Sequence, residues 1–426
     1  DYSLGVPSNS ADQFDWNSRI EDFNFKQDFS WFLNTNNKID FGLNIIKHHF
    51  EPGNIETNVS SFFEPLKLTN YNAISSAAYI SNEQKFGSLL TIKYGLRLSV
   101  FQQIGIGKVR EYENPASPQS DEIVSETSYK TGEKIGSPFI NFEPRVSAKI
   151  STGETSSIKT SYNRMAQNLH LISNTNSPTP LDIWLPSNKY IKPLIVNQVA
   201  AGYFRNFQKN TYETSLEFYY KDMQNVLDYK DGAELFLNED LETELLTGTG
   251  YAYGMEIMIK KQEGQFTGWA SYTLAKSMRE IPGINNGDPY PSSYDRTHDF
   301  SLVSNYDISK RISLSASWVF STGNPVTYPI AKYNVQGNTL FYYSDRNSNR
   351  IPDYHRLDLS FNYNFRKNEY RKVKQSLNVS LYNVYGRRNA YSIYFRPNED
   401  NPAIIEATRL SIVGTMIPSI TYNINF

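Results

Sequence analysis

The sequence predicts an all-β protein, a transmembrane antiparallel β-barrel of about fifteen strands. Apolar and polar residues alternate along most of the chain. In RISLSASWVF, for example, Ile312, Leu314 and Trp318 share one face, and Ser313 and Ser315 share the other. Aromatic residues make up 14% of the chain (31 Tyr, 25 Phe and 5 Trp), and such residues favour strands and membrane interfaces. Short and long connections also follow one another in turn between the alternating segments.

The alternating segments give the expected strands in chain order. They cover residues 18–33, 38–50, 69–82, 87–102, 138–151, 156–170, 194–207, 211–226, 247–262, 265–278, 295–307, 310–322, 353–365, 373–397 and 404–426. Connections at one end are short and polar, such as TNNK at 35–38 and TGET at 152–155. Connections at the other end are long, as at 103–137 and 323–352.

This sorting of connections by length favours an outer-membrane barrel over a soluble β-sandwich. Bacterial barrels have short periplasmic turns and long extracellular loops, whereas a sandwich has no reason to sort its loops in this way. No run of about 18 apolar residues occurs, which excludes transmembrane helices. The sequence therefore predicts a protein of the bacterial outer membrane.

The C-terminal segment PSITYNINF is an amphipathic strand that ends on Phe426. With short turns in the periplasm, this strand places Phe426 at the periplasmic edge. Such terminal strands resemble the signal that the barrel-assembly machinery recognises, although a residue of the aromatic girdle explains Phe426 equally well. Closed single-chain barrels have an even number of strands, so a count of about fifteen predicts that this chain is not a whole barrel. The N-terminal segment shows no signal peptide, so we expect either a removed signal or a start partway through a longer protein.

Composition and motifs argue against catalysis, a metal centre or nucleic-acid binding. The chain has no cysteine, a net charge of −2 and scattered Lys and Arg residues. Its five histidines are dispersed, and no Ser-His-Asp set, phosphate loop or HExxH motif occurs. Asp345, Asn347 and Asn349 are spaced like the start of a calcium loop, but Arg350 and Arg356 stand where that loop needs Gly and Glu. We expect no catalytic residue, no cofactor and no metal site.

Several charged and aromatic residues remain as candidates for binding. The residues expected to line a polar lumen, opposite the lipid-facing aromatics, are Glu217, Lys221, Glu256, Lys260, Arg356 and Asp358. Trp184 and Tyr190, in DIWLPSNKY, lie in or near a predicted extracellular loop and could stack on a sugar or another ligand. An acidic stretch from Asp228 to Glu244 could bind a cation or a basic partner, although solvated loop charge is the simpler interpretation.

Several longer segments, taken in order, resemble a known family. They are EPR at 143–145, SYNRMAQNLHLISNTNSPTPLDIWLPSNKYIKPLIVNQVAAGYFRNF, YGMEIMIKKQEGQFTGWASYTLAKS, PSSYDRTHDFSLVSNYDISKRISLSASWVFSTGNPVTYP, RNSNRIPDYHRLDLSFNYNF, SLYNVYGRRNAYSIYF and IPSITYNINF. Together they resemble the barrel of TonB-dependent receptors of the Bacteroidetes type, over essentially all of residues 14–426.

The resemblance implies a barrel of about 22 strands, of which residues 1–426 would form the C-terminal part. It also implies a plug, absent from this chain, that contacts the charged lumen and gates the import of a scarce large solute such as a siderophore, an oligosaccharide or a peptide. The implied partners are outer-membrane lipid, TonB through the plug region, the barrel-assembly machinery, and a surface lipoprotein or other outer-membrane subunits. The alternative is a structural or scaffolding barrel subunit of a larger outer-membrane complex, without transport.

Overall fold

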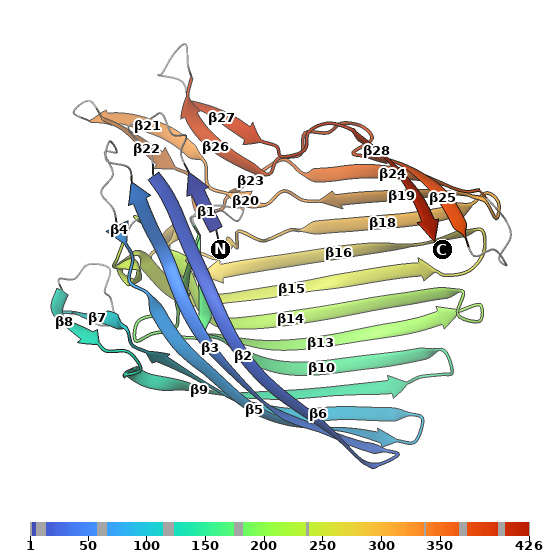
Figure 1. Cartoon of the computed structure of the whole chain (residues 1–426), viewed down its shortest axis with the longest axis horizontal. Helices are drawn as coiled ribbons and strands as arrows, with labels where there is room; N and C mark the ends of the chain where they lie inside the picture. Colours follow the sequence, from blue (N-terminus) through green and yellow to red (C-terminus); the bar gives the residue numbers. More distant parts are fainter. Residues whose placement is uncertain are drawn as a thin grey trace.

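The computed structural model of the chain contains one large antiparallel sheet of 18 strands (Figure 1). It describes residues 2–5, 14–57, 66–113, 123–173, 182–235, 238–335, 338–365, 373–398 and 405–425. Three strands of the sheet are short: β1 (Tyr2–Gly5), β4 (Leu66–Lys67) and β17 (Tyr290–Pro291). The long strands are β2 (Phe14–Asn34), β3 (Asn37–Thr57), β5 (Tyr71–Phe86), β6 (Leu90–Ile104), β9 (Lys134–Ser151), β10 (Ser156–Gln167), β13 (Leu194–Phe207), β14 (Tyr212–Tyr229), β15 (Leu245–Lys261), β16 (Phe266–Glu280), β18 (His298–Asp307), β19 (Ile312–Ser321), β24 (Tyr354–Asn364), β25 (Lys374–Tyr382) and β28 (Ile417–Asn425).

Each long strand pairs with the next long strand along the chain, from β2 to β28. Each of the predicted strands therefore has its counterpart, and the predicted β class is confirmed. The short turns gather at one end of the sheet, on the right of Figure 1, and the long connections gather at the other. Within the described residues, β2 and β28 do not pair with each other, so the sheet has two open edges.

The two faces of the sheet carry different side chains because successive residues of a strand point to opposite sides. The outer face exposes large apolar residues, such as Phe25, Phe218 and Leu359. The inner face is polar; there, for example, the Ser315 hydroxyl donates a 2.7 Å hydrogen bond to Asn305. An apolar outer face suits hydrocarbon, which offers no hydrogen-bond partners. Among the described residues, no helix has the length and apolar character that crossing a membrane requires.

The long connections carry secondary structure of their own. They contain the hairpins β7/β8 (Gly107–Tyr112 and Ile123–Tyr129), β11/β12 (Leu169–Ile172 and Ile183–Pro186), β21/β22 (Pro329–Val335 and Asn338–Tyr343) and β26/β27 (Ser392–Pro397 and Ile405–Leu410). They also contain the antiparallel pair of β20 (Pro325–Val326) and β23 (Asn349–Arg350), and the short helices η2 (Leu241–Glu244) and η3 (Asn285–Gly287).

An apolar cluster ties several of these connections to the barrel wall. Ile183 and Leu185 of the β11/β12 hairpin pack with Trp16 of β2, Leu68 and Leu241, and all five are buried. Burial of this kind stabilises by roughly 25 cal/mol per Å² of apolar surface removed from water. The β11/β12 hairpin is therefore fixed at the mouth of the barrel rather than extended into solvent.

Two of the predicted strands are wrong in their length. The segment 373–397 is interrupted after β25, and the segment 404–426 is interrupted between β27 and β28. The break after β25 comes at Asn383, which has a φ of 53° and is buried, and Gly386 also has a positive φ. The Asn383 side chain donates to the Arg387 carbonyl at 3.0 Å, which holds the chain in a turn. Phe426 lies outside the described residues, so its predicted role is not tested.

Candidate functional site

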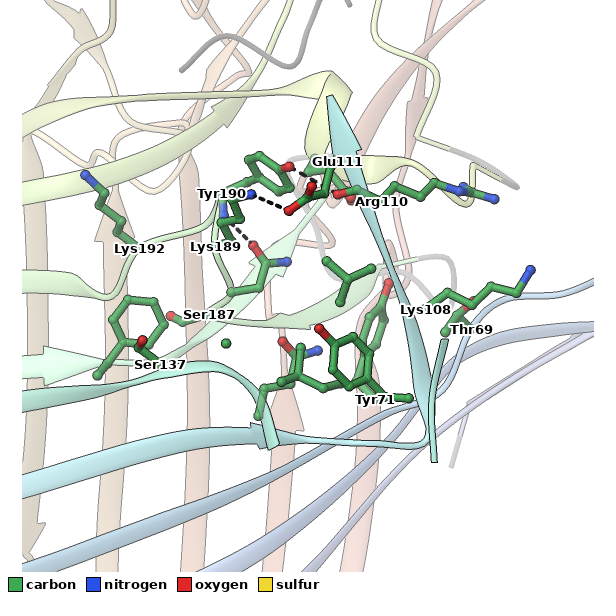
Figure 2. Close-up of a pocket in the computed structure, with 18 of the residues that line it drawn as sticks. Thr69, Tyr71, Lys108, Arg110, Glu111, Ser137, Ser187, Lys189, Tyr190 and Lys192 are labelled. Atoms are coloured by element: carbon green, nitrogen blue, oxygen red, sulfur yellow. Dashed lines mark hydrogen bonds and ion pairs between the residues drawn. The ribbon is translucent and has the colours of Figure 1, made fainter. Parts of the chain in front are cut away.

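A cavity of about 470 Å³ lies at the long-loop end of the sheet, a size that suits part of a small organic ligand. Three connections build it: the one that carries β7/β8, the segment 187–193 before β13, and the segment 230–244 before β15. Figure 2 shows Glu111 of strand β7 pointing toward Lys189 and Tyr190, while the Arg110 side chain extends to the other side of the strand. We call this space the mouth cavity.

Tyr190, one of the two predicted ligand-binding residues, lines the mouth cavity. An Asx turn places it: the Asn188 side-chain oxygen accepts hydrogen bonds from the backbone N–H groups of Tyr190 at 2.8 Å and Ile191 at 2.9 Å. The Tyr190 hydroxyl donates to the Arg110 carbonyl at 3.1 Å, and its ring meets Tyr112 edge-on at 5.3 Å. The Tyr190 side chain therefore also holds the loops together.

The charges around the mouth cavity are largely paired with one another. Arg110 binds Glu239 at 3.0 Å and also binds Asp240, both in the β14–β15 connection. Lys189 binds Glu111 at 2.9 Å, and this hydrogen bond lowers the pKa of Glu111. Burial raises the pKa of Glu242, which accepts a hydrogen bond from Tyr112. A ligand would meet aromatic rings, hydroxyls and amides more than unpaired charge.

Gln103 is the polar group best placed to contact a ligand in the mouth cavity. The residue is 8% exposed and lines the cavity from the inner face of β6. Within the described part of the chain, its side-chain amide makes no hydrogen bond to protein. Because this amide has no protein partner, it is free to hydrogen-bond a ligand hydroxyl or carbonyl.

Trp184, the second predicted ligand-binding residue, is not in the mouth cavity. It lines another cavity, of about 690 Å³, between the β11/β12 hairpin and the inner face of β6 and β9. Buried His48 and Glu143 share this space with Arg97 and Arg145. The structure thus separates Trp184 from Tyr190, and the hairpin with the linker 187–193 lies between their two cavities.

The predicted lumen residues occupy the inner face but do not form one group. Glu217 of β14 stands directly opposite Glu256 of β15, and Lys260 lies 3.5 Å from Glu213. Arg356 and Asp358 pair with each other on β24 at 2.9 Å.

Further partners fix the Arg356–Asp358 pair at the start of the β25–β28 connection. The Arg356 guanidinium donates to the Tyr382 hydroxyl at 2.6 Å, and Asp358 accepts from the Asn383 N–H at 2.8 Å. This pair therefore anchors a connection. Glu217 and Glu256, by contrast, carry the same negative charge and cannot neutralise each other.

The interpretation of the acidic stretch as solvated charge is wrong for Asp228. Asp228 is buried and accepts hydrogen bonds from Arg346 at 3.0 Å, Arg279 at 3.0 Å and the Tyr290 hydroxyl at 2.8 Å. Arg346 also binds Asp231 at 2.7 Å. This set, the Asp228 network, joins three long connections of the barrel.

The segment that resembles a calcium loop serves the same connections. Asn347 is buried and donates its side-chain amide to the Pro291 carbonyl at 2.9 Å, and Asn349 donates to Ser344 at 3.2 Å. These two side-chain amides hold the segment to the neighbouring connections. Within the residues the structure describes, no group of three His, Asp or Glu side chains could hold a metal ion.

His170 of β11 makes the mouth sensitive to acid. Burial lowers its pKa from 6.5 to about 4, and its Nε2 lies 3.1 Å from the Ser187 hydroxyl. In the unfolded hairpin His170 takes up a proton below pH 6.5, whereas in the folded hairpin it does so only near pH 4. The stability of the folded hairpin is therefore constant above pH 6.5 and falls as the pH decreases from 6.5 to 4. We expect a loss of about 2.5 kcal/mol at pH 4.5. Hydrogen exchange of the β11/β12 amides at pH 7 and pH 4.5 measures this loss of stability. His170→Gln should make the stability of the hairpin the same at both pH values.

Gln103 and Arg110 were not identified from the sequence, and Asp228 was identified only as part of the acidic stretch. Nothing in the local sequence marks Gln103 as different from other inward polar residues. Arg110 and Asp228 gain their roles from partners more than one hundred positions away, at separations of 130 and 118 residues. The signal that was available is Asn188, because an Asn two residues before an aromatic in SNKY is typical of a turn that presents the ring.

The comparisons with known proteins agree with this architecture. Residues 1–384 match the family model described as TonB dependent receptor-like, beta-barrel. A comparison with curated protein sequences found no match.

Among solved structures, the ferripyoverdine receptor of the outer membrane of Pseudomonas aeruginosa has a TM-score of 0.56 at 13% identity, over 96% of this chain and 48% of that one. The ferric-catecholate import receptor Fiu of Escherichia coli K12 has a TM-score of 0.58 at 14% identity, over 97% of this chain and 55% of that one. The FrpB iron transporter of Neisseria meningitidis has a TM-score of 0.57 at 13% identity, over 97% and 55%. This chain therefore spans about half the length of these proteins, whose names describe receptors and transporters. It belongs to the TonB-dependent receptor-like β-barrels, which are proteins of the bacterial outer membrane.

Proposed function

We propose that residues 1–426 form the C-terminal part of the barrel of a TonB-dependent transporter of the Bacteroidetes type, which imports a scarce solute too large for porins. The observation that carries this proposal is the mouth cavity. Long connections build it at the end of the barrel expected to face outward, and a polar inner face continues below it. A solute bound there would be positioned over the barrel interior.

The inner face supports a path from the mouth cavity into the barrel. Along β6, Gln103 lines the mouth cavity and Arg97 lines the cavity that also holds Trp184. A third inner cavity, of about 510 Å³, shares Arg97 and Arg145 with the second. Several weak polar contacts in series suit transport, because a solute must bind well enough to enter and loosely enough to leave.

A plug domain is the partner we propose for the unbalanced inner charges. Glu217 and Glu256 face each other across one strand pair and would gain most from a cationic group of a plug. The proposed solutes are a siderophore, an oligosaccharide or a peptide. Siderophores come first for testing, since the proteins of similar fold include the ferripyoverdine receptor and the ferric-catecholate import receptor.

Uptake in cells with and without TonB coupling tests the proposal. We expect cells that produce the complete protein to accumulate at least one member of a panel of ⁵⁵Fe-labelled siderophores and radiolabelled oligosaccharides and peptides. In a TonB-uncoupled strain, uptake should fall to the level of a deletion strain while binding at the surface persists. Uptake that is unchanged by uncoupling, or absent for the whole panel, would favour the scaffolding role instead.

A further inference from the structure

Three polar side chains on neighbouring strands form a set that no local sequence motif reveals. Asp22 of β2 stands directly opposite His48 of β3, and His48 stands opposite Ala73 of β5. Ser75 follows Ala73 by two positions, so its side chain lies on the same inner face as the other two. Strands β2, β3 and β5 lie side by side (Figure 1), and their register brings positions 22, 48 and 75 together.

Hydrogen bonds join these side chains in the order Asp–His–Ser. The Nδ1 atom of His48 lies 2.7 Å from the Asp22 carboxylate, and its Nε2 atom lies 2.8 Å from the Ser75 hydroxyl. A carboxylate only accepts hydrogen bonds, so Nδ1 of His48 carries a proton. In the neutral ring, Nε2 then has a free lone pair, which accepts the hydrogen bond from Ser75. In this arrangement a histidine can take the proton from a serine hydroxyl.

Packing holds the His48 ring in this orientation. Only 4% of its side chain is exposed, and its ring stacks on Phe50 with the ring centres 5.7 Å apart. The buried ring of Phe101, on β6, lies 6.5 Å from the His48 ring. A general base must be held within hydrogen-bond reach of the proton that it takes, and this packing meets that requirement before any substrate binds.

A substrate can reach the Ser75 hydroxyl from the cavity of about 690 Å³ that also contains Trp184, because both His48 and Ser75 line this cavity. Arg97 lines it too, and within the described part of the chain its guanidinium makes no hydrogen bond or ion pair. Other lining residues are apolar, among them Met165, Leu169, Leu194 and Val196. The cavity therefore combines a serine with its base, apolar surface for an acyl group, and N–H donors for a carbonyl oxygen.

We propose that Ser75, His48 and Asp22 form a catalytic triad that hydrolyses carboxylic esters with a short apolar acyl group. The Ser75 oxygen attacks the ester carbonyl carbon while His48 takes the serine proton, and Arg97 stabilises the negative charge on the carbonyl oxygen. The bond between the carbonyl carbon and the alcohol oxygen then breaks. The alcohol leaves with the proton from His48, and the acyl group stays on Ser75.

A water molecule completes the reaction. It gives a proton to His48 and attacks the acyl group, the bond to the Ser75 oxygen breaks, and that oxygen regains the proton from His48. The products are a carboxylic acid and the free enzyme. We expected no catalytic residue from the sequence, because Asp22 and Ser75 lie 26 and 27 positions from His48. The register of three strands creates the set, and this activity lies outside the proposed transport function.

A covalent probe tests the triad on the complete protein purified from outer membranes. Diisopropyl fluorophosphate reacts with a serine that an adjacent base activates, and mass spectrometry of the digested protein identifies the labelled residue. We expect an adduct on Ser75 in the folded protein and none in protein unfolded in guanidinium chloride. The rate of p-nitrophenyl butyrate hydrolysis should fall about 100-fold in Ser75→Ala and in Asp22→Asn.

Ser76→Ala is the matched control. Ser76 is the next residue of the same strand but faces outward, opposite Ile45, whose side chain is 47% exposed. Its loss should leave both the adduct and the hydrolysis rate unchanged. His48→Gln should abolish the adduct on Ser75. If this variant fails to assemble, Asp22→Asn tests the same step at a side chain that is 46% exposed and therefore tolerates the change.

Two results would overturn the proposal. One is the absence of a Ser75 adduct in the folded protein. The other is an adduct that forms as fast in Asp22→Asn as in the unchanged protein. Either would show that the three hydrogen-bonded side chains only brace the inner face of the sheet. Both assays work without TonB and without a transported solute, so their failure is distinct from a failure of the uptake test.

Discussion

Replacement of Asp228 with alanine is expected to destabilise the mouth of the barrel by about 3–5 kcal/mol. Arg346 has a side chain only 6% exposed and would lose its 3.0 Å contact with the Asp228 carboxylate. Arg279 and the Tyr290 hydroxyl would lose the other carboxylate oxygen. The cost is large because the buried guanidinium keeps only the exposed carboxylate of Asp231 as a charged partner, and water cannot easily replace Asp228.

Hydrogen exchange of the three joined connections measures this effect best, because the barrel wall itself should stay folded. Amides at 227–232, 281–292 and 344–350 should exchange faster in Asp228→Ala, while those of the long strands remain protected. Asp231→Ala is the matched control. Asp231 binds the same Arg346 at 2.7 Å, but its side chain is 74% exposed, so its loss should cost less than about 1 kcal/mol. Equal effects of the two variants would show that the Asp228 network does not hold the loops.

The barrel wall could be predicted from the sequence because its signal is local. A strand with a lipid face and an inner face must alternate in steps of two, and each turn of a meander joins neighbours in the chain. The predicted strands failed where this local rule did not apply. At Asn383 the buried side chain donates a hydrogen bond to the backbone of its own turn, which breaks the strand. Apolar and polar residues alternate on both sides of this break, so the sequence predicts one long strand there.

The mouth cavity could be predicted only in part, for a physical reason. Tyr190 was identified because an exposed aromatic ring in an extracellular loop can stack on a ligand, and the structure places it on the cavity wall. Trp184, chosen by the same reasoning, lies in a different cavity, since the β11/β12 hairpin folds inward. Arg110 and Asp228 have roles that depend on how separate loops meet. The sequence of a single loop does not show which residues of other loops it will contact.

An arginine in place of Phe218, on the outer face of the barrel, should destabilise the protein. This ring is half exposed on β14 and lies in register with Ala201 of β13 and Met255 of β15, on the apolar outer face. Phe218→Arg is expected to destabilise the folded barrel in lipid by about 2–4 kcal/mol, because near the middle of the bilayer a guanidinium loses its water. Urea titrations of folding into phosphatidylcholine vesicles give the difference.

The neighbouring residue provides a control that separates lipid exposure from the addition of a bulky cation. Glu217 precedes Phe218 on the same strand, faces inward and stands opposite Glu256. Glu217→Arg introduces the same side chain one position away, but there it meets water and a carboxylate, so we expect no loss of stability and a small gain from the removal of like charges. The two variants should therefore differ by several kcal/mol in vesicles. If they cost the same, the assignment of the two faces is wrong, and with it the argument that the apolar face of this sheet is the one that meets lipid.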